Sequence, residues 1–206
     1  MLPGPRAELA HRRSPLATGG PDRTRLYTRT GDRGETGLSG GGRVGKSSTR
    51  IRTFGSYDEL GASLGVAEAA LPPTESEVAK LLVRLQHQLY VAMSELATPP
   101  GAKPPAHLIG SRHVTDLEKE IDRYSETIEP VHAFVLPRGT AAGSAIHVAR
   151  TISRRAEREL WGLHAEAPQR EELLQWANRL SDLLFAVALV VNRRAGFAEL
   201  SPDYAI

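Results

Sequence analysis

The pattern of hydrophobic and polar residues changes near residue 55. Residues 1–24 show no apolar period and are rich in Pro and Arg. From residue 55 onward, apolar residues recur at intervals of three and four, which is the period of an amphipathic helix. This pattern predicts five helices with short joints, at about 56–71, 75–97, 111–127, 139–163 and 170–195. Five antiparallel helices with short connections form an up-and-down bundle, so the sequence predicts an all-α fold.

Local signals set the ends of these helices. Ser56-Tyr-Asp-Glu59 matches a capping box and predicts that the first helix begins at Ser56. Gly196 is placed to end the last helix as its C′ glycine. The second half of the last helix is apolar nearly all round, which predicts a buried central helix. The segment His132–Arg138 is a short apolar stretch that we expect to be a loop tucked against the core.

Composition narrows the class of protein. The chain has 206 residues, enough for one domain with a substantial core, and no Cys, which excludes disulfides and thiolate metal sites and fits a cytoplasmic protein. The net charge of +2 argues against a nucleic-acid partner. The longest apolar run, Leu183–Val191, is too short to span a membrane. We expect residues 1–24 to be a disordered extension, 25–196 the helical domain and 197–206 a tail.

Residues 40–47, GGGRVGKS, match the P-loop signature letter for letter. A P-loop needs a buried parallel strand before the glycines and a helix directly after the lysine. Residues 27–39 contain only two bulky apolar residues, and Ser47–Phe54 alternates in the manner of an extended segment. We therefore expect the match to be accidental, in a mobile glycine-rich loop, and keep a P-loop nucleotide hydrolase as the alternative.

The first predicted helix carries a second, unusual face beside its large apolar stripe. Small residues headed by a carboxylate share this face: Asp58, Gly61, Ala62, Gly65 and Ala69. Small side chains let another helix approach closely. The face therefore predicts either a subunit interface or tight packing inside one bundle.

The fourth and fifth predicted helices carry polar side chains that need partners. One strip of the fourth helix, about 100° wide by helical spacing, holds Arg150, Arg154, Glu157 and Arg158. Like charges one turn apart repel, so the strip is either an anion site or a solvated surface. On the fifth helix, Asn178 and Asp182 lie one turn apart. Because a buried carboxylate is unfavourable unless paired, either Asp182 bonds an Arg of the fourth helix or Asn178 and Asp182 both line a polar pocket.

Several segments together resemble one known family. They are YTRTGDRGETGL (27–38), FGSYDELGASLG (54–65), FVLPRG (134–139), ARTISRRAEREL (149–160) and NRLSDLLF (178–185). In order and spacing, over residues 26 to about 195, the chain resembles the PduO-type ATP:cob(I)alamin adenosyltransferases, which include the human mitochondrial enzyme. The resemblance implies a five-helix bundle that forms a homotrimer with active sites between subunits.

The resemblance also implies the reaction. The 5′-deoxyadenosyl group of ATP would pass to cob(I)alamin, giving adenosylcobalamin and triphosphate, with Mg²⁺ carried by the phosphates. Cob(I)alamin is a strong nucleophile, so no Ser, Cys or His base is needed, and the protein supplies placement and charge neutralisation. A flavin-type reductase and an adenosylcobalamin-dependent enzyme are the partners implied. A non-enzymatic bundle that binds an anion or carries cobalamin is the second alternative.

Site residues follow from the resemblance position by position. The implied ATP-binding residues are Thr28, Arg29, Thr30, Gly31, Asp32, Gly34, Thr36, Gly37, Lys46, Arg154, Arg155, Glu157, Arg158 and Asn178. The implied catalytic residues are Asp58, Arg150, Phe134 and Arg154, with Asp58 pairing Arg150 across the subunit boundary. Phe134 and Asp182 are implied to bind cobalamin, and Phe134 to displace the lower axial base of the corrin, which eases reduction to cob(I)alamin.

Two single residues and one three-residue segment depart from the family pattern. Arg29 stands where Lys is usual, and Arg138 where a small residue is usual. Ser47-Ser-Thr49 replaces a frequent Asp-Asp-Pro. These departures leave the conformations of the phosphate loop and of the corrin loop for the structure to determine.

Overall fold

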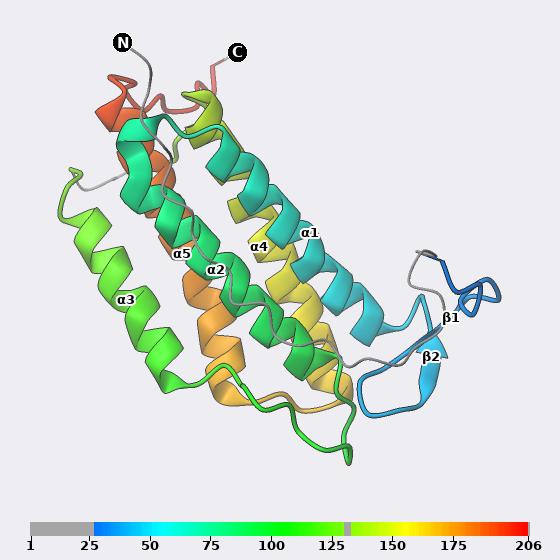
Figure 1. The fold of residues 1–206 in the computed structure, drawn as a ribbon. Helices are drawn as coiled ribbons and strands as arrows, with labels where there is room; N and C mark the ends of the chain where they lie inside the picture. The colour runs from blue at the N-terminus through cyan, green and yellow to red at the C-terminus, as the bar shows by residue number, and fades with distance from the viewer. Residues whose placement is uncertain (1–26, 130–132, 206) are drawn as a thin grey trace, which may run out of the picture.

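Five helices form the bundle in the computed structural model, which describes residues 27–129 and 133–205. They are α1 (Thr49–Ala69), α2 (Ser76–Leu96), α3 (Ser111–Ser125), α4 (Ala141–Glu166) and α5 (Glu171–Arg194), with a short 3-10 turn, η1 (Pro73–Glu75), before α2. The helices run alternately up and down the bundle (Figure 1). The predicted all-α five-helix bundle is confirmed.

Helix α5 forms the centre of the core. It packs against α4 and α3, while α1 packs against α4 and α2. The indole of Trp176 is fully buried, and its Nε1 donates to Oε1 of Gln88 on α2 at 2.9 Å. Among the described residues, α5 is also the one helix long and apolar enough to cross a membrane, but 72% of its apolar window is buried inside the bundle. The apolar composition of α5 is explained by its burial in the core of the bundle.

The end of α5 has the geometry that the sequence predicts. Gly196 has φ 80°, its N–H donates to the Arg193 carbonyl at 2.9 Å, and the Phe197 N–H donates to the Asn192 carbonyl at 2.9 Å. This pair of bonds is a Schellman motif, which satisfies carbonyls that the helix leaves open. The C′ glycine is therefore confirmed.

The predicted start of α1 is wrong. The helix begins at Thr49, and Ser56 and Glu59 lie inside it. Tertiary contacts override the local signals: Thr53 is fully buried, and its hydroxyl is shared between the carbonyls of Thr49 and of Glu159 on α4. The Thr49 hydroxyl also donates to Glu166 at 2.6 Å. Packing against α4 therefore converts the alternating segment into the first two turns of the helix.

A small β-hairpin precedes α1 at one end of the bundle (Figure 1). Its strands are β1 (Glu35–Gly37) and β2 (Arg43–Gly45), paired antiparallel with Thr36 opposite Val44. Gly40, Gly41 and Gly42 form the turn, all with φ between 82° and 100°. Side chains other than glycine rarely adopt this region, so the glycines are needed for the turn geometry. A three-residue antiparallel strand is not the buried parallel strand of a P-loop, although a helix does begin three residues after Lys46.

The segment between α3 and α4 is a loop, as expected, but it is not tucked against the core. Phe134 is 80% exposed, and Leu136 and Arg138 are also exposed. The Leu136 N–H donates to the Leu200 carbonyl at 2.8 Å, so the loop pairs with the tail that follows α5. His132 and residues 1–24 lie outside the described residues.

Candidate active site

The N-terminal segment forms a compact turn beneath a lysine. The Gly34 N–H donates to the Gly31 carbonyl at 3.2 Å, and the Lys46 N–H donates to the Gly34 carbonyl at 2.8 Å. The Lys46 ammonium covers Gly31 so closely that a Cβ at position 31 would lie 3.1 Å from Nζ. The structure thus brings Lys46 and the TGDRG turn together, although they are 15 positions apart in sequence.

Arg43 holds this segment in place, and sequence reasoning missed it. Its Nη2 donates to the carbonyls of Thr30 at 2.6 Å and Glu35 at 3.2 Å, and its Nε pairs with the Glu35 carboxylate at 3.3 Å. It acts as a brace between β2 and the turn. The sequence carried no signal for this role, because it depends on a hairpin whose strands are too short to show a period.

The remaining predicted residues of this segment are close by. Thr28 and Thr30 share a hydroxyl hydrogen bond of 2.8 Å, Thr36 and Gly37 lie on β1, and Asp32 is exposed. Arg29 has φ 58°, a left-handed conformation, with its guanidinium 5.2 Å from the ring centroid of Tyr27.

The polar strip of α4 divides into paired and unpaired side chains. Glu157 accepts from Asn178 Nδ2 on α5 at 2.9 Å, and Arg155 forms an ion pair with Glu59 on α1. That hydrogen bond lowers the pKa of Glu59 and raises the pKa of Arg155. Among the described residues, Arg154 and Arg158 have no carboxylate partner within 4.0 Å, and both are exposed. Two cations on one face are thus available for an anion.

Asp58 and Arg150 are not paired within the chain. Asp58 is exposed on α1, and the Nε of Arg150 is buried without a hydrogen-bond partner among the described residues. Arg150 instead lies 5.7 Å from the ring centroid of Phe185. Burial, together with the neighbouring Arg154 charge, lowers the pKa of Arg150.

A cavity of about 400 Å³ lies between α3 and α5. It is lined mainly by apolar side chains, with Asp182 and Glu129 as its carboxylates: Ile121, Ser125, Ile128, Glu129, Asp182, Phe185, Ala186 and Leu189. Desolvation, with a contribution from Glu157, raises the pKa of Asp182, although Arg179 and Arg154 oppose the shift. Asp182 is exposed and lines this cavity rather than bonding an arginine of α4, but the predicted polar pocket shared with Asn178 is wrong, because the lining is mainly apolar and Asn178 bonds Glu157 instead. Phe134 is not among the lining residues of this cavity.

His147 lies near Phe185, one of the residues that line this cavity, and was given no role from the sequence. It is buried on α4, its ring is 6.2 Å from that of Phe185, and its Nδ1 has no partner among the described residues. Desolvation, helped by the charge of Arg150, lowers the pKa of His147 to about 4. The imidazole is therefore neutral at physiological pH.

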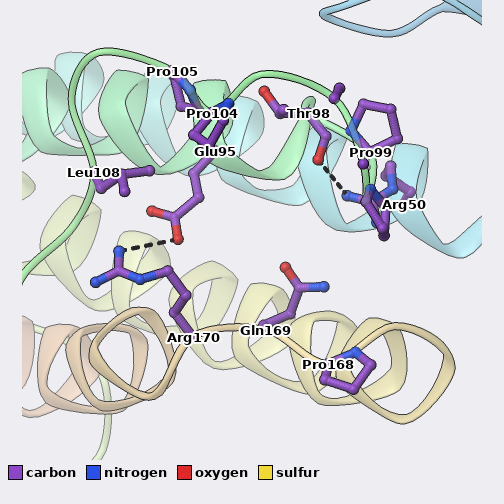
Figure 2. A pocket seen from close by; sticks show the side chains of 13 residues that line it. Arg50, Glu95, Thr98, Pro99, Pro104, Pro105, Leu108, Pro168, Gln169 and Arg170 are labelled. Atoms are coloured by element: carbon purple, nitrogen blue, oxygen red, sulfur yellow. Dashed lines mark hydrogen bonds and ion pairs between the residues drawn. The ribbon is translucent and has the colours of Figure 1, made fainter.

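A second cavity, of about 310 Å³, lies where the α2–α3 connection meets the α4–α5 connection (Figure 2). Its charged groups are already paired: Arg170 bonds Glu95 at 3.3 Å, and Arg50 donates to the Leu96 carbonyl at 2.6 Å. It contains none of the predicted site residues. Within residues 27–129 and 133–205, no group of three His, Asp or Glu side chains is placed to hold a metal ion.

Comparison with known proteins identifies the family. The family model for cobalamin adenosyltransferases matches residues 26–191. The chain is 40% identical over 179 residues to a corrinoid adenosyltransferase of Bacillus subtilis, covering 85% of this chain and 91% of the relative. It is 41% identical over 164 residues to the PduO corrinoid adenosyltransferase of Salmonella typhimurium, covering 79% of this chain but 48% of that longer relative.

Solved structures agree with the sequence relatives. A variant PduO-type ATP:corrinoid adenosyltransferase from Lactobacillus reuteri, complexed with cobalamin and ATP, superposes with a TM-score of 0.83 at 31% identity, covering 87% of this chain and 97% of that one. By fold and by sequence, then, the molecule is a transferase of the corrinoid-modifying class. The chain belongs to the cobalamin adenosyltransferase family, and its activity is ATP-dependent adenosyl transfer to a corrinoid.

Proposed function

We propose that the chain transfers the 5′-deoxyadenosyl group of ATP to cob(I)alamin at sites shared between the subunits of a homotrimer. The observation that carries this proposal is the grouping of the Lys46 ammonium with the turn of Gly31 and Gly34. Together with Arg154 and Arg158, Lys46 supplies positive charge from side chains without a carboxylate partner among the described residues.

The chemistry needs charge neutralisation more than it needs a base. As cobalt attacks C5′, the bond from C5′ to oxygen breaks and the triphosphate leaves with the electron pair. Cations placed where that charge develops stabilise the transition state. Lys46, Arg154 and Arg158 are assigned this role, with Mg²⁺ carried by the phosphates. The remaining ATP contacts are assigned to Thr28, Arg29, Thr30, Gly31, Asp32, Gly34, Thr36, Gly37, Arg155, Glu157 and Asn178.

The arrangement of the chain supports a site shared between subunits. The hairpin and the segment that carries Phe134 lie at opposite ends of the bundle (Figure 1). The 21 residues of α1 alone span about 30 Å, so one chain presents Lys46 and Phe134 far apart. A site that uses both draws them from two copies. Asp58 and Arg150, which form no ion pair with the residues that the structure describes, are proposed to meet across the same boundary.

The small-residue face of α1 supports a subunit interface in part. Gly61 and Gly65 pack on α2 within the chain, where Gln86 Nε2 donates to the Gly61 carbonyl at 2.9 Å. Ala62 and Ala69 are instead exposed, and the adjoining Val66 is 65% exposed. Packing inside the bundle thus accounts for Gly61 and Gly65, and the exposed half of the face is proposed to be covered by a neighbouring subunit.

The corrin is assigned to the apolar cavity between α3 and α5, with Asp182 at its wall and Phe134 at its lower axial side. Cob(I)alamin requires a reductant, so a flavin-type reductase is proposed to supply it, and an adenosylcobalamin-dependent enzyme to take the product. The absence of Cys is the feature that supports a cytoplasmic location.

A spectroscopic assay tests the proposal. Purified protein is supplied with ATP, Mg²⁺ and chemically reduced cobalamin, and formation of the Co–C bond is followed with the phosphate product. Adenosylcobalamin and triphosphate should appear together. No adenosylcobalamin would refute the proposal, and orthophosphate release without a corrin would favour the P-loop alternative. Sedimentation of the protein tests the trimer separately.

A further inference from the structure

Asn192 is a buried polar residue in the last turn of the apolar helix α5. Its side chain is 6% exposed, and a buried amide is tolerated only when its groups are paired. Its Oδ1 accepts from the Thr140 N–H at 3.0 Å and from the Thr140 hydroxyl at 3.1 Å, and its Nδ2 donates to the Arg138 carbonyl at 2.7 Å. Every bond of this amide goes to the end of the segment that carries Phe134.

Two glycines make room for the Asn192 amide. Gly139 has φ 135°, and a Cβ at that position would overlap the amide. A Cβ at Gly143, in the first turn of α4, would overlap it as well. The close approach of α5 to this loop therefore depends on glycine at both positions.

The same bonds extend into α4. Thr140 is the N-cap of α4, and its Oγ1 accepts from the Gly143 N–H at 2.9 Å. Asn192 thus ties the end of the loop to two helices at once. Phe134 precedes this anchored end by four residues, and its ring is 80% exposed. The loop is fixed at its base while its aromatic residue projects outward.

We propose that Asn192 is the positioning residue that holds Phe134 at the lower axial side of the corrin. The inference rests on the proposed function, because it takes the Phe134 ring to fill the volume that the displaced axial base vacates. A ring can do this only if the base of its loop stays fixed. A leucine would fill the same space at the end of α5 and would leave the loop unanchored.

Two variants separate positioning from packing. Asn192→Leu removes all three bonds, and Asn192→Asp keeps the acceptor but cannot donate to Arg138. Each is assayed with ATP for the fraction of four-coordinate cob(II)alamin, and for turnover of cobalamin and of cobinamide, which lacks the lower base. Asn192→Leu should lower cobalamin turnover about tenfold, as expected for a misplaced group, with the four-coordinate fraction falling in parallel. Asn192→Asp should have an intermediate effect, and cobinamide turnover and KM for ATP should stay near wild type.

A matched control is available in the core. Gln88→Leu removes another buried amide bond, that to Trp176 at 2.9 Å, without touching the loop, and should leave the four-coordinate fraction unchanged. Equal loss of cobalamin and cobinamide turnover in Asn192→Leu, or an unchanged four-coordinate fraction, would overturn the proposal. If Asn192→Leu does not fold, the same two readouts of Asn192→Asp decide.

Hydrogen exchange of the free protein distinguishes this proposal from the function on which it rests. The Thr140 amide should exchange faster in Asn192→Leu than in wild type, whatever the enzyme does with cobalamin, because this variant lacks the Oδ1 that accepts from the Thr140 N–H. An unchanged Thr140 exchange rate would refute the anchor itself. Wild-type protein that forms no adenosylcobalamin would instead refute the proposed function.

Discussion

The N-terminal segment, residues 27–46, and helix α5 are opposite in burial. Almost every residue of the segment is exposed, and backbone hydrogen bonds and the Arg43 brace hold it. Helix α5 is buried along most of its length and packs mainly against α3 and α4. The proposed phosphate chemistry therefore depends on residues 27–46, which add little to the stability of the fold. Substitutions in the segment should therefore change activity alone, and those in α5 should change stability.

The largest stability effect is expected at Trp176. Trp176→Ala would empty a fully buried site, strand the Gln88 amide and remove the ring that lies 6.2 Å from Tyr57. The free energy of unfolding should fall by about 3–5 kcal/mol, measured by urea denaturation. Gln175→Ala, at the exposed neighbouring position, is the control and should change it little. A loss below about 1 kcal/mol for Trp176→Ala would contradict the central role of α5.

The segment should show the reverse behaviour at Lys46. Lys46→Ala removes a charge from the proposed triphosphate site, so kcat/KM should fall about 100-fold, or about 2.7 kcal/mol. The urea midpoint should not move, because the side chain is exposed. Lys103→Ala, an exposed lysine of the α2–α3 connection, should leave the kinetics unchanged. Equal losses in the two variants would show that general surface charge, rather than this site, is responsible.

The sequence predicts α5 well and the segment poorly, for physical reasons. Because α5 is buried on nearly every side, its second half is a continuous run of apolar residues, which the sequence shows directly. A single glycine, Gly196, marks its end. The hairpin is set by a turn of three glycines and by Arg43, and three-residue strands are too short to show a period. The start of α1 fails for another reason, because contacts with α4 at Thr49 and Thr53 replace the local cap.

The candidate site, too, is predicted from the sequence only in part. The resemblance to the family assigns the ATP-binding and corrin-binding residues by their positions in the motifs. Their roles stay proposals. No motif marks the contacts of Asn192, because its partners Arg138 and Thr140 are distant in sequence. Asn192 did leave one signal, a polar side chain after the apolar run Val187–Val191, because a buried amide implies a partner.

A pH experiment tests the buried half of the comparison, through the buried imidazole of His147. His147 has a pKa of about 4 in the folded protein, against about 6.5 when unfolded. Between these values the unfolded state binds the extra proton, so stability falls as the pH is lowered from 6.5 toward 4. At pH 4.5 the loss attributable to His147 should be about 2–3 kcal/mol relative to pH 7. His147→Leu should be less sensitive to this pH change by that amount in urea denaturation, and identical pH dependence in both proteins would contradict the neutral buried imidazole.

The smallest effect is expected in the hairpin turn. Gly41 has φ 100° and no neighbour within 4 Å of a Cβ added there, so Gly41→Ala is strained by backbone conformation alone. The strain is about 1 kcal/mol and falls on the hairpin rather than on the bundle. KM for ATP should therefore rise about fivefold, the factor that 1 kcal/mol gives, while the urea midpoint stays at the wild-type value. Gly101→Ala, with φ 84° and equally open surroundings in the α2–α3 connection, controls for strain outside the segment. A lowered urea midpoint in Gly41→Ala would mean that the hairpin and the bundle unfold as one unit, and the separation between exposed chemistry and buried stability would then fail.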